Sequence, residues 1–168
     1  MEGKILVAYA SKYGATAEIA EKIGETLREA GLQVDVTPVD KVGDVSSYNA
    51  FIIGSAVYIG LWRKKAVKFI QANEEALADK PVWIFSSGPT GEEEDDAFMD
   101  GGNLPKKLKD VAALIKPRGI VIFRGAVDLE KLKGLEKWMI KKAKGSLGDF
   151  RDWEAVTSWA KEIAASLR

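Results

Sequence analysis

The sequence predicts an α/β fold of the doubly wound type, with a five-stranded parallel sheet in the order 2-1-3-4-5. Four segments of strand length are almost wholly apolar, namely residues 4–9, 50–55, 81–85 and 119–124. Such runs are typical of parallel strands covered on both faces, because a solvated face would impose alternation. The segment 32–39 alternates and contains Pro38. Proline cannot donate to a strand ladder, so this segment is predicted to be an edge strand.

Helical patterns separate and follow these strands, which favours right-handed crossovers and helices on both faces of the sheet. The first helix follows a polar turn at residues 10–16, shows apolar residues at helical spacing, and is expected to end at Gly31. The last helix is predicted to pack in the core, with Asp152 as its N-cap. The later helical patterns cover residues 66–76, 106–115, 129–144 and 152–167.

The turn at residues 10–16 is predicted to bind an anion. It contains the hydroxyls of Ser11 and Thr16 and one glycine, directly before a helix. Helix N-termini bind phosphate through their unpaired N–H groups and the helix dipole. An ordinary helix cap would show the same residue types. Neither a P-loop nor a dinucleotide-binding fingerprint is supported, because both glycine motifs are absent from the sequence.

Composition limits the chemistry that the chain can carry. The 25 basic and 25 acidic residues balance, which argues against nucleic-acid binding through bulk charge. Cysteine and histidine are absent, which excludes disulfides, thiolate nucleophiles, cysteine-ligated clusters, most zinc sites and the commonest general base. Redox chemistry must therefore come from a bound cofactor. The length of 168 residues suits a single domain over residues 1–168.

Two charged segments each allow two interpretations. The basic amphipathic segment 129–144 could contact an anionic membrane surface, but we favour a helix that covers the sheet. The acidic run 92–96 could lower the reduction potential of a nearby cofactor, but we favour a solvated loop. No apolar stretch approaches the roughly 20 residues that span a bilayer, and no basic-then-apolar leader precedes the first strand. A cytoplasmic protein is expected.

Three loops are predicted to meet at the carboxyl edge of the sheet, beside the switch point between the first and third strands. They are residues 11–16, 55–63 and 86–91. The second loop places Tyr58 and Trp62 around Gly60, in a segment expected to be exposed. These aromatics could stack on a flat conjugated ring, or they could pack under the loop as core. The third loop offers N–H groups and hydroxyls that suit the polar edge of such a ring.

These loops resemble the FMN-binding loops of the flavodoxin superfamily in the motifs ASKYGAT at 10–16, GSAVY at 54–58 and SSGP at 86–89. The resemblance covers nearly the whole chain and implies a flavodoxin-like fold with FMN as cofactor. It assigns the FMN phosphate to Ser11, Lys12, Tyr13, Gly14, Ala15 and Thr16. It assigns the isoalloxazine ring to Ser55, Ala56, Val57, Tyr58, Ile59, Gly60, Leu61, Trp62, Ser86, Ser87, Gly88, Pro89, Thr90 and Gly91.

The C-terminal third is similar to the flavodoxin-type, quinone-dependent protoporphyrinogen IX dehydrogenases. The similar motifs are Trp138–Lys141 before a glycine turn and Asp152–Glu154 at the start of the last helix. Two functions follow from these resemblances, neither with a catalytic acid or base from the chain. One is an FMN-binding redox protein whose partner is a redox protein or a quinone. The other is an enzyme, either an FMN-dependent protoporphyrinogen IX dehydrogenase or a quinone reductase.

A third function, a phosphoacceptor signalling module on the same topology, would need carboxylates after the first and third strands. Ala10-Ser11 and Gly54-Ser55 offer none, so this function is set aside.

Overall fold

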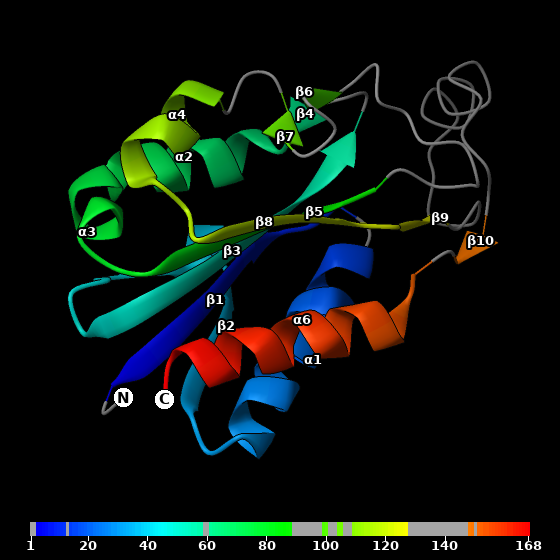
Figure 1. Cartoon of the computed structure of the whole chain (residues 1–168). Coiled ribbons are helices and arrows are strands. Elements are labelled where there is room, and N and C mark those ends of the chain that lie inside the picture. Colours follow the sequence, from blue (N-terminus) through cyan, green and yellow to red (C-terminus); the bar gives the residue numbers. More distant parts are fainter. Residues whose placement is uncertain are drawn as a thin grey trace.

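A parallel sheet lies between two layers of helices (Figure 1). The structure is a computed structural model that describes residues 3–12, 14–58, 61–88, 99–100, 104–105, 109–127, 148–149 and 151–168. One face of the sheet is covered by α1 (Ala15–Glu29) and α6 (Trp153–Ser166). The other face is covered by α2 (Lys64–Ala72), α3 (Glu74–Ala78) and α4 (Lys109–Ile115). The two chain ends lie at the same side of the molecule in this view.

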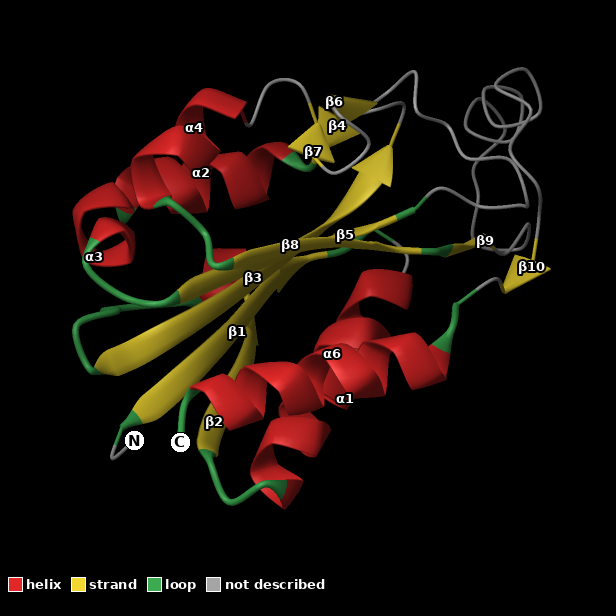
Figure 2. Ribbon diagram, viewed as in Figure 1, coloured by secondary structure: helices red, strands yellow, loops and turns green. Residues whose placement is uncertain are grey.

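The strand order confirms the predicted 2-1-3-4-5 topology. The parallel strands are β1 (Lys4–Ala10), β2 (Gln33–Pro38), β3 (Tyr48–Tyr58), β5 (Val82–Ser87) and β8 (Gly119–Phe123). They lie in the order β2-β1-β3-β5-β8, and every neighbouring pair is parallel (Figure 2). Such a sheet brings the carboxyl ends of β1, β3 and β5 to one edge.

The burial of the strands explains why their sequences are apolar. All side chains of β5 and most of β1 are buried, since helices cover both faces of these inner strands. β2 lies at the edge of the sheet, as predicted. Its last residue, Pro38, lies opposite Tyr9 of β1. Proline has no N–H to donate, and Pro38 stands where the pairing of β2 with β1 ends.

The segment predicted as a loop at residues 55–63 is in part a β-hairpin, so that prediction is wrong. β3 continues to Tyr58, and the short strand β4 (Leu61–Trp62) returns antiparallel to it. Val57 lies opposite Trp62 in this hairpin. A β-branched residue beside an aromatic one is a favourable cross-strand pair, which extends the strand beyond its apolar core.

Short elements complete the described chain. The 3-10 turn η1 (Val39–Lys41) follows β2. Two antiparallel pairs join β6 (Met99–Asp100) to β7 (Leu104–Pro105) and β9 (Ala126–Val127) to β10 (Gly148–Asp149). The predicted acidic loop at 92–96 and the predicted basic helix at 129–144 lie outside the described residues. Among the helices that are described, none is both long enough and apolar enough to cross a membrane.

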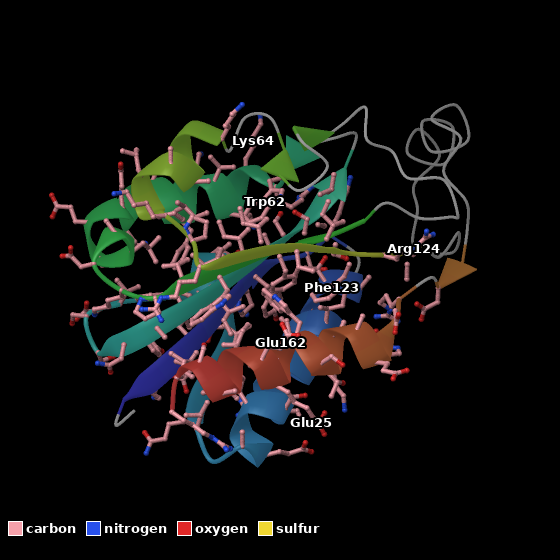
Figure 3. All side chains as sticks on the ribbon, in the orientation of Figure 1. Glu25, Trp62, Lys64, Phe123, Arg124 and Glu162 are labelled. Carbon is pink, nitrogen blue, oxygen red and sulfur yellow. The ribbon has the colours of Figure 1, made fainter. Side chains whose placement is uncertain are left out.

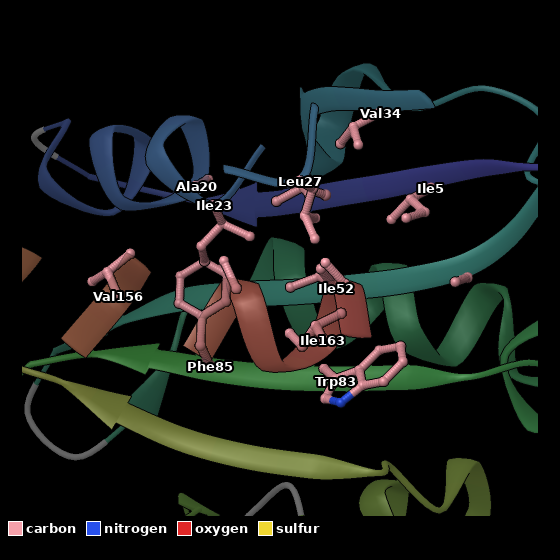
Figure 4. Close-up of a cluster of buried hydrophobic side chains, with 14 of the residues drawn as sticks. Ile5, Ala20, Ile23, Leu27, Val34, Ile52, Trp83, Phe85, Val156 and Ile163 are labelled. Carbon is pink, nitrogen blue, oxygen red and sulfur yellow. The ribbon is translucent and has the colours of Figure 1, made fainter. Parts of the chain in front are cut away.

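Two hydrophobic clusters fill the space on either side of the sheet. The cluster beneath α1 and α6 includes Ile23, Phe85 and Val156 (Figure 4). Phe85 also makes tilted or edge contacts with Phe123 and Trp159, with ring centroids 6.1 and 6.2 Å apart. The core position predicted for the last helix is confirmed. Its predicted N-cap is confirmed too, because the side chain of Asp152 accepts a hydrogen bond from the N–H of Ala155 at 3.0 Å.

Candidate functional site

The carboxyl ends of β1, β3 and β5 bring the described parts of the three predicted loops together. Ala10 of β1 lies opposite Ser55 of β3, and Ser55 lies opposite Ser86 of β5. Six residues of the predicted site fall outside the described residues, namely Tyr13, Ile59, Gly60, Pro89, Thr90 and Gly91. The structure describes the backbone but not the side chains of Tyr58 and Leu61.

The first loop is closed by its own serine. The N–H of Gly14 donates to the hydroxyl oxygen of Ser11 at 3.0 Å. Gly14 has φ +94°, a left-handed conformation that favours glycine, and α1 begins at the next residue. Gly14 is itself the N-cap of α1 and makes no side-chain cap bond. Within the described residues, no Ser or Thr side chain caps α1. Anion binding at this turn stays a prediction.

Two hydroxyls at this edge are buried without a hydrogen-bond partner among the described residues. Thr16, in the first turn of α1, is 1% exposed, and Ser87, at the end of β5, is 5% exposed. No hydrogen bond from either hydroxyl is present in this part of the chain. Buried hydroxyls nearly always have a partner. Thr16 and Ser87 are therefore candidate groups for binding a polar ligand.

Trp62 is buried, so the prediction of an exposed aromatic at this position is wrong. Its side chain is 5% exposed and packs with the cluster beneath α2, as Figure 3 shows. The indole N–H donates to the hydroxyl of Ser86 at 2.8 Å. A tryptophan can be buried in this way because its one polar group finds a partner. Contact between Trp62 and a ligand stays a prediction.

The β3–β4 hairpin is held at the same level by a second serine. The hydroxyl of Ser55 accepts a hydrogen bond from the N–H of Arg63 at 3.0 Å and donates to the carbonyl of Ala56 at 2.9 Å. Ser55 and Ser86 are neighbours across β3 and β5. One serine thus holds the backbone after β4, and the other holds the indole of β4.

The third loop turns sharply at Gly88, where φ is +126°. The N–H of Gly88 donates to the carbonyl of Phe123 at 2.9 Å, which joins the loop to the end of β8. Gly125 packs against this turn, since a Cβ placed on it would lie 3.3 Å from the nitrogen of Gly88. Sequence reasoning did not single out Gly125. A glycine two residues beyond a strand is too common a feature to have identified it.

Sequence reasoning also missed Arg151, which reaches the first loop from the other end of the chain. Its side chain is 10% exposed. The guanidinium donates to the carbonyl of Ala15 at 3.4 Å and forms an ion pair with Glu18. It also donates to both carboxylate oxygens of Asp149, at 2.9 and 2.6 Å. No periodicity or motif surrounds Arg151 that could have indicated this contact.

The contacts of Arg151 shift the pKa values of two charged groups. The hydrogen bonds from Arg151 lower the pKa of Asp149 to about 2. The same bonds to Asp149 raise the pKa of Arg151, and the contact with Glu18 adds to this. Arg151 therefore stays charged throughout the physiological pH range, as does Asp149. Within the described residues, no group of three or more metal-ligating side chains gathers.

Comparison with known proteins identifies relatives of the chain. Residues 6–153 match the family model described as Flavodoxin domain. Protoporphyrinogen IX dehydrogenase (quinone) of Escherichia coli strain K12 is 24% identical over 172 aligned residues, which cover 96% of this chain and 94% of that protein. An NAD(P)H dehydrogenase (quinone) of Caulobacter vibrioides strain NA1000 is 31% identical over 114 residues, which cover 52% of this chain and 57% of that protein.

Solved structures share the fold. The flavodoxin of Streptococcus pneumonia TIGR4 superposes with a TM-score of 0.61 at 21% identity, covering 98% of this chain and 99% of that one. The rubredoxin oxygen:oxidoreductase of Desulfovibrio gigas gives a TM-score of 0.64 at 17% identity. That match covers 98% of this chain but only 36% of the larger protein.

Proposed function

This chain belongs to the flavodoxin domain family, and we propose that it holds FMN non-covalently at the carboxyl edge of its sheet and passes electrons to a quinone or a redox partner protein. The family implies a flavin cofactor and a redox function. FMN is the more specific part of the proposal. The observation that carries it is the pair of buried hydroxyls, Thr16 and Ser87, that have no hydrogen-bond partner among the described residues, at the edge where β1 and β5 end.

The phosphate of FMN is assigned to the first loop and the first turn of α1. The hydroxyl of Thr16 is buried there and is available to donate to a phosphate oxygen. Gly14 adopts a positive φ directly before α1, and the N–H groups that follow it are proposed to bind the phosphate. Ser11 holds this turn in shape through its bond to Gly14. Helix N-termini bind phosphate without a dedicated lysine.

The ring of FMN is assigned to the second and third loops. Ser87 offers its hydroxyl. Gly88 has a positive φ and no side chain, so a ligand could approach the backbone of this turn closely. Trp62 supports this region from beneath through its bond to Ser86. Tyr58, at the end of β3, is the aromatic residue proposed to stack on the ring.

When bound, FMN would supply two-electron transfer between a reductant and an acceptor such as a quinone, which would be reduced to the quinol. The chain contains neither histidine nor cysteine. Proton transfer through an imidazole or a thiol is therefore excluded. What the residues contribute is binding, orientation of the ring and control of access to its edge.

A second candidate function is the oxidation of a porphyrinogen with a quinone as electron acceptor. The E. coli protein named for that reaction aligns with 96% of this chain. A carrier that only exchanges electrons with protein partners would not need to bind a porphyrinogen. Turnover of protoporphyrinogen IX with a quinone therefore separates the two candidates.

The first experiment is the visible absorption spectrum of the purified protein, before and after FMN is added and unbound flavin is removed. We expect a retained flavin spectrum that is bleached by anaerobic reduction and restored when a soluble quinone is added. A protein that retains no flavin would overturn the proposal. Flavin that is retained but cannot be reoxidised by a quinone would restrict the function to a protein partner.

A further inference from the structure

We propose that Arg151 is a positioning residue of the phosphate site, which fixes the first turn of α1 and neutralises Glu18 beside it. The inference rests on the proposed function, because the phosphate concerned is that of FMN. Arg151 lies in the segment between β10 and α6, far along the chain from the loop that it contacts.

The contacts of Arg151 place it against the phosphate loop. One guanidinium nitrogen donates to the carbonyl of Ala15, the first residue of α1, and pairs with the carboxylate of Glu18. The other two nitrogens donate to Asp149, and the guanidinium lies 4.7 Å from the centre of the Trp153 ring. A cation that is nine-tenths buried is costly unless it is paired, and these contacts pair it fully.

The balance of charge indicates what Arg151 contributes. Two carboxylates, from Glu18 and Asp149, surround its single positive charge. Arg151 therefore adds no net positive charge that would attract a phosphate. Its effect is instead on Glu18, which sits in the first turn of α1 where an anion would bind. An unpaired carboxylate at that place would repel a phosphate.

A second arginine provides a natural comparison between the same two helices. Arg168 follows α6 and donates to the carbonyl of Ala30, just after α1, at 2.9 Å. Arg151 and Arg168 thus join opposite ends of two helices that run parallel (Figure 1). If Arg151 only held the helices together, the two arginines would be equivalent. Only Arg151 lies at the end that faces the phosphate loop.

The test compares the dissociation constants of FMN and riboflavin, which differ in the phosphate. We expect Arg151→Ala to weaken FMN binding about tenfold, with riboflavin binding changed less than about twofold. Arg151→Lys should lose about threefold for FMN, because one ammonium group cannot replace the planar fork. Arg168→Ala should leave the ratio of the two dissociation constants unchanged. Low salt should enlarge the effect of Arg151→Ala, because the repulsion from Glu18 is less screened.

Several outcomes would overturn the inference. An equal loss of affinity for FMN and riboflavin would show a structural role alone, as would the same selective loss in Arg168→Ala. If Arg151→Ala does not fold, Arg151→Lys decides the matter, because it keeps the charge while altering the contacts. A wild-type chain that binds neither flavin contradicts the proposed function, whereas normal FMN selectivity in both Arg151 variants contradicts only this inference.

Discussion

The amino and carboxyl edges of the sheet differ in whether their polar groups are paired, because two buried hydroxyls at the carboxyl edge lack a partner among the described residues. At the amino edge, the carboxylate of Asp35 accepts hydrogen bonds from Lys4 at 2.8 Å and from Tyr48 at 2.6 Å. Lys80 donates in turn to the carbonyl of Tyr48 at 2.6 Å. At the carboxyl edge, the hydroxyls of Thr16 and Ser87 are buried and have no partner within the described residues.

This difference separates groups that contribute to stability from groups that are available for binding. Paired groups at the amino edge stabilise the fold and leave nothing for a ligand. At the carboxyl edge, the two buried hydroxyls that lack a partner in the described part of the chain carry a desolvation cost of about 1–3 kcal/mol each, which a ligand that bonds to them would recover. The comparison predicts that removing a paired polar group at the amino edge lowers stability, whereas removing an unpaired hydroxyl at the carboxyl edge weakens flavin binding.

The largest effect is expected beneath the carboxyl edge, where Gly54 of β3 touches the core. A Cβ at this position would lie 2.0 Å from the ring of Phe85, a side chain that Figure 4 shows within the hydrophobic cluster, beside Ile23. We expect Gly54→Ala to lower the free energy of unfolding by about 2–3 kcal/mol, because the ring must shift within a packed core. Urea denaturation measures this.

Gly43→Ala is the matched control for that substitution. A Cβ on Gly43 would meet no atom within 4 Å. The change in the free energy of unfolding should therefore stay within about 0.5 kcal/mol. A Gly54→Ala variant as stable as Gly43→Ala would contradict the packing described for this edge.

The next effect is on binding. Thr16→Val keeps the shape of the side chain and removes only its hydroxyl. We expect FMN affinity to fall about five- to tenfold while the free energy of unfolding without flavin stays the same or rises slightly. Flavin fluorescence titration and urea denaturation measure the two quantities.

Thr26 provides the control on the same helix. It is also buried, but its hydroxyl donates to the carbonyl of Lys22 at 2.9 Å. Thr26→Val should therefore leave FMN affinity unchanged. A loss of stability in Thr16→Val as large as in a variant that breaks a buried hydrogen bond would refute the claim that its hydroxyl is unpaired.

A smaller effect is expected at the amino edge. Tyr48→Phe removes the hydrogen bond to Asp35, and we expect it to lower the free energy of unfolding by about 1 kcal/mol. FMN affinity should not change, since this side chain lies at the far edge of the sheet from the proposed site. A selective loss of flavin binding in this variant would contradict the claim that the amino edge contributes only to stability.

The smallest effect concerns the alkaline pH range. Burial, and then the hydrogen bond to Asp35, raise the pKa of Tyr48 from 10.0 to about 12. The folded chain thus keeps a proton that the unfolded chain loses, so the free energy of unfolding should fall as the pH rises from 10 to 12. Tyr48→Phe should show a weaker decline over that range. Thermal denaturation at several pH values tests this.

Local patterns in the sequence were enough to predict the five parallel strands, their order and the long helices α1 and α6. Apolar runs at β1, β3 and β5 reported burial on both faces, Pro38 marked an edge strand, and helical periodicity located α1 and α6. These signals are local, because the pattern along one element records which of its faces meets the core. The convergence of the three loops followed from the topology.

The contacts of individual side chains, by contrast, depend on how distant segments pack together. The sequence around Trp62 allowed both exposure and burial, and the choice depends on Ser86, which lies 24 residues away. Arg151 reaches Ala15 across 136 residues. Such contacts leave no trace in the local pattern of either segment, because each exists only after the strands and helices have packed together.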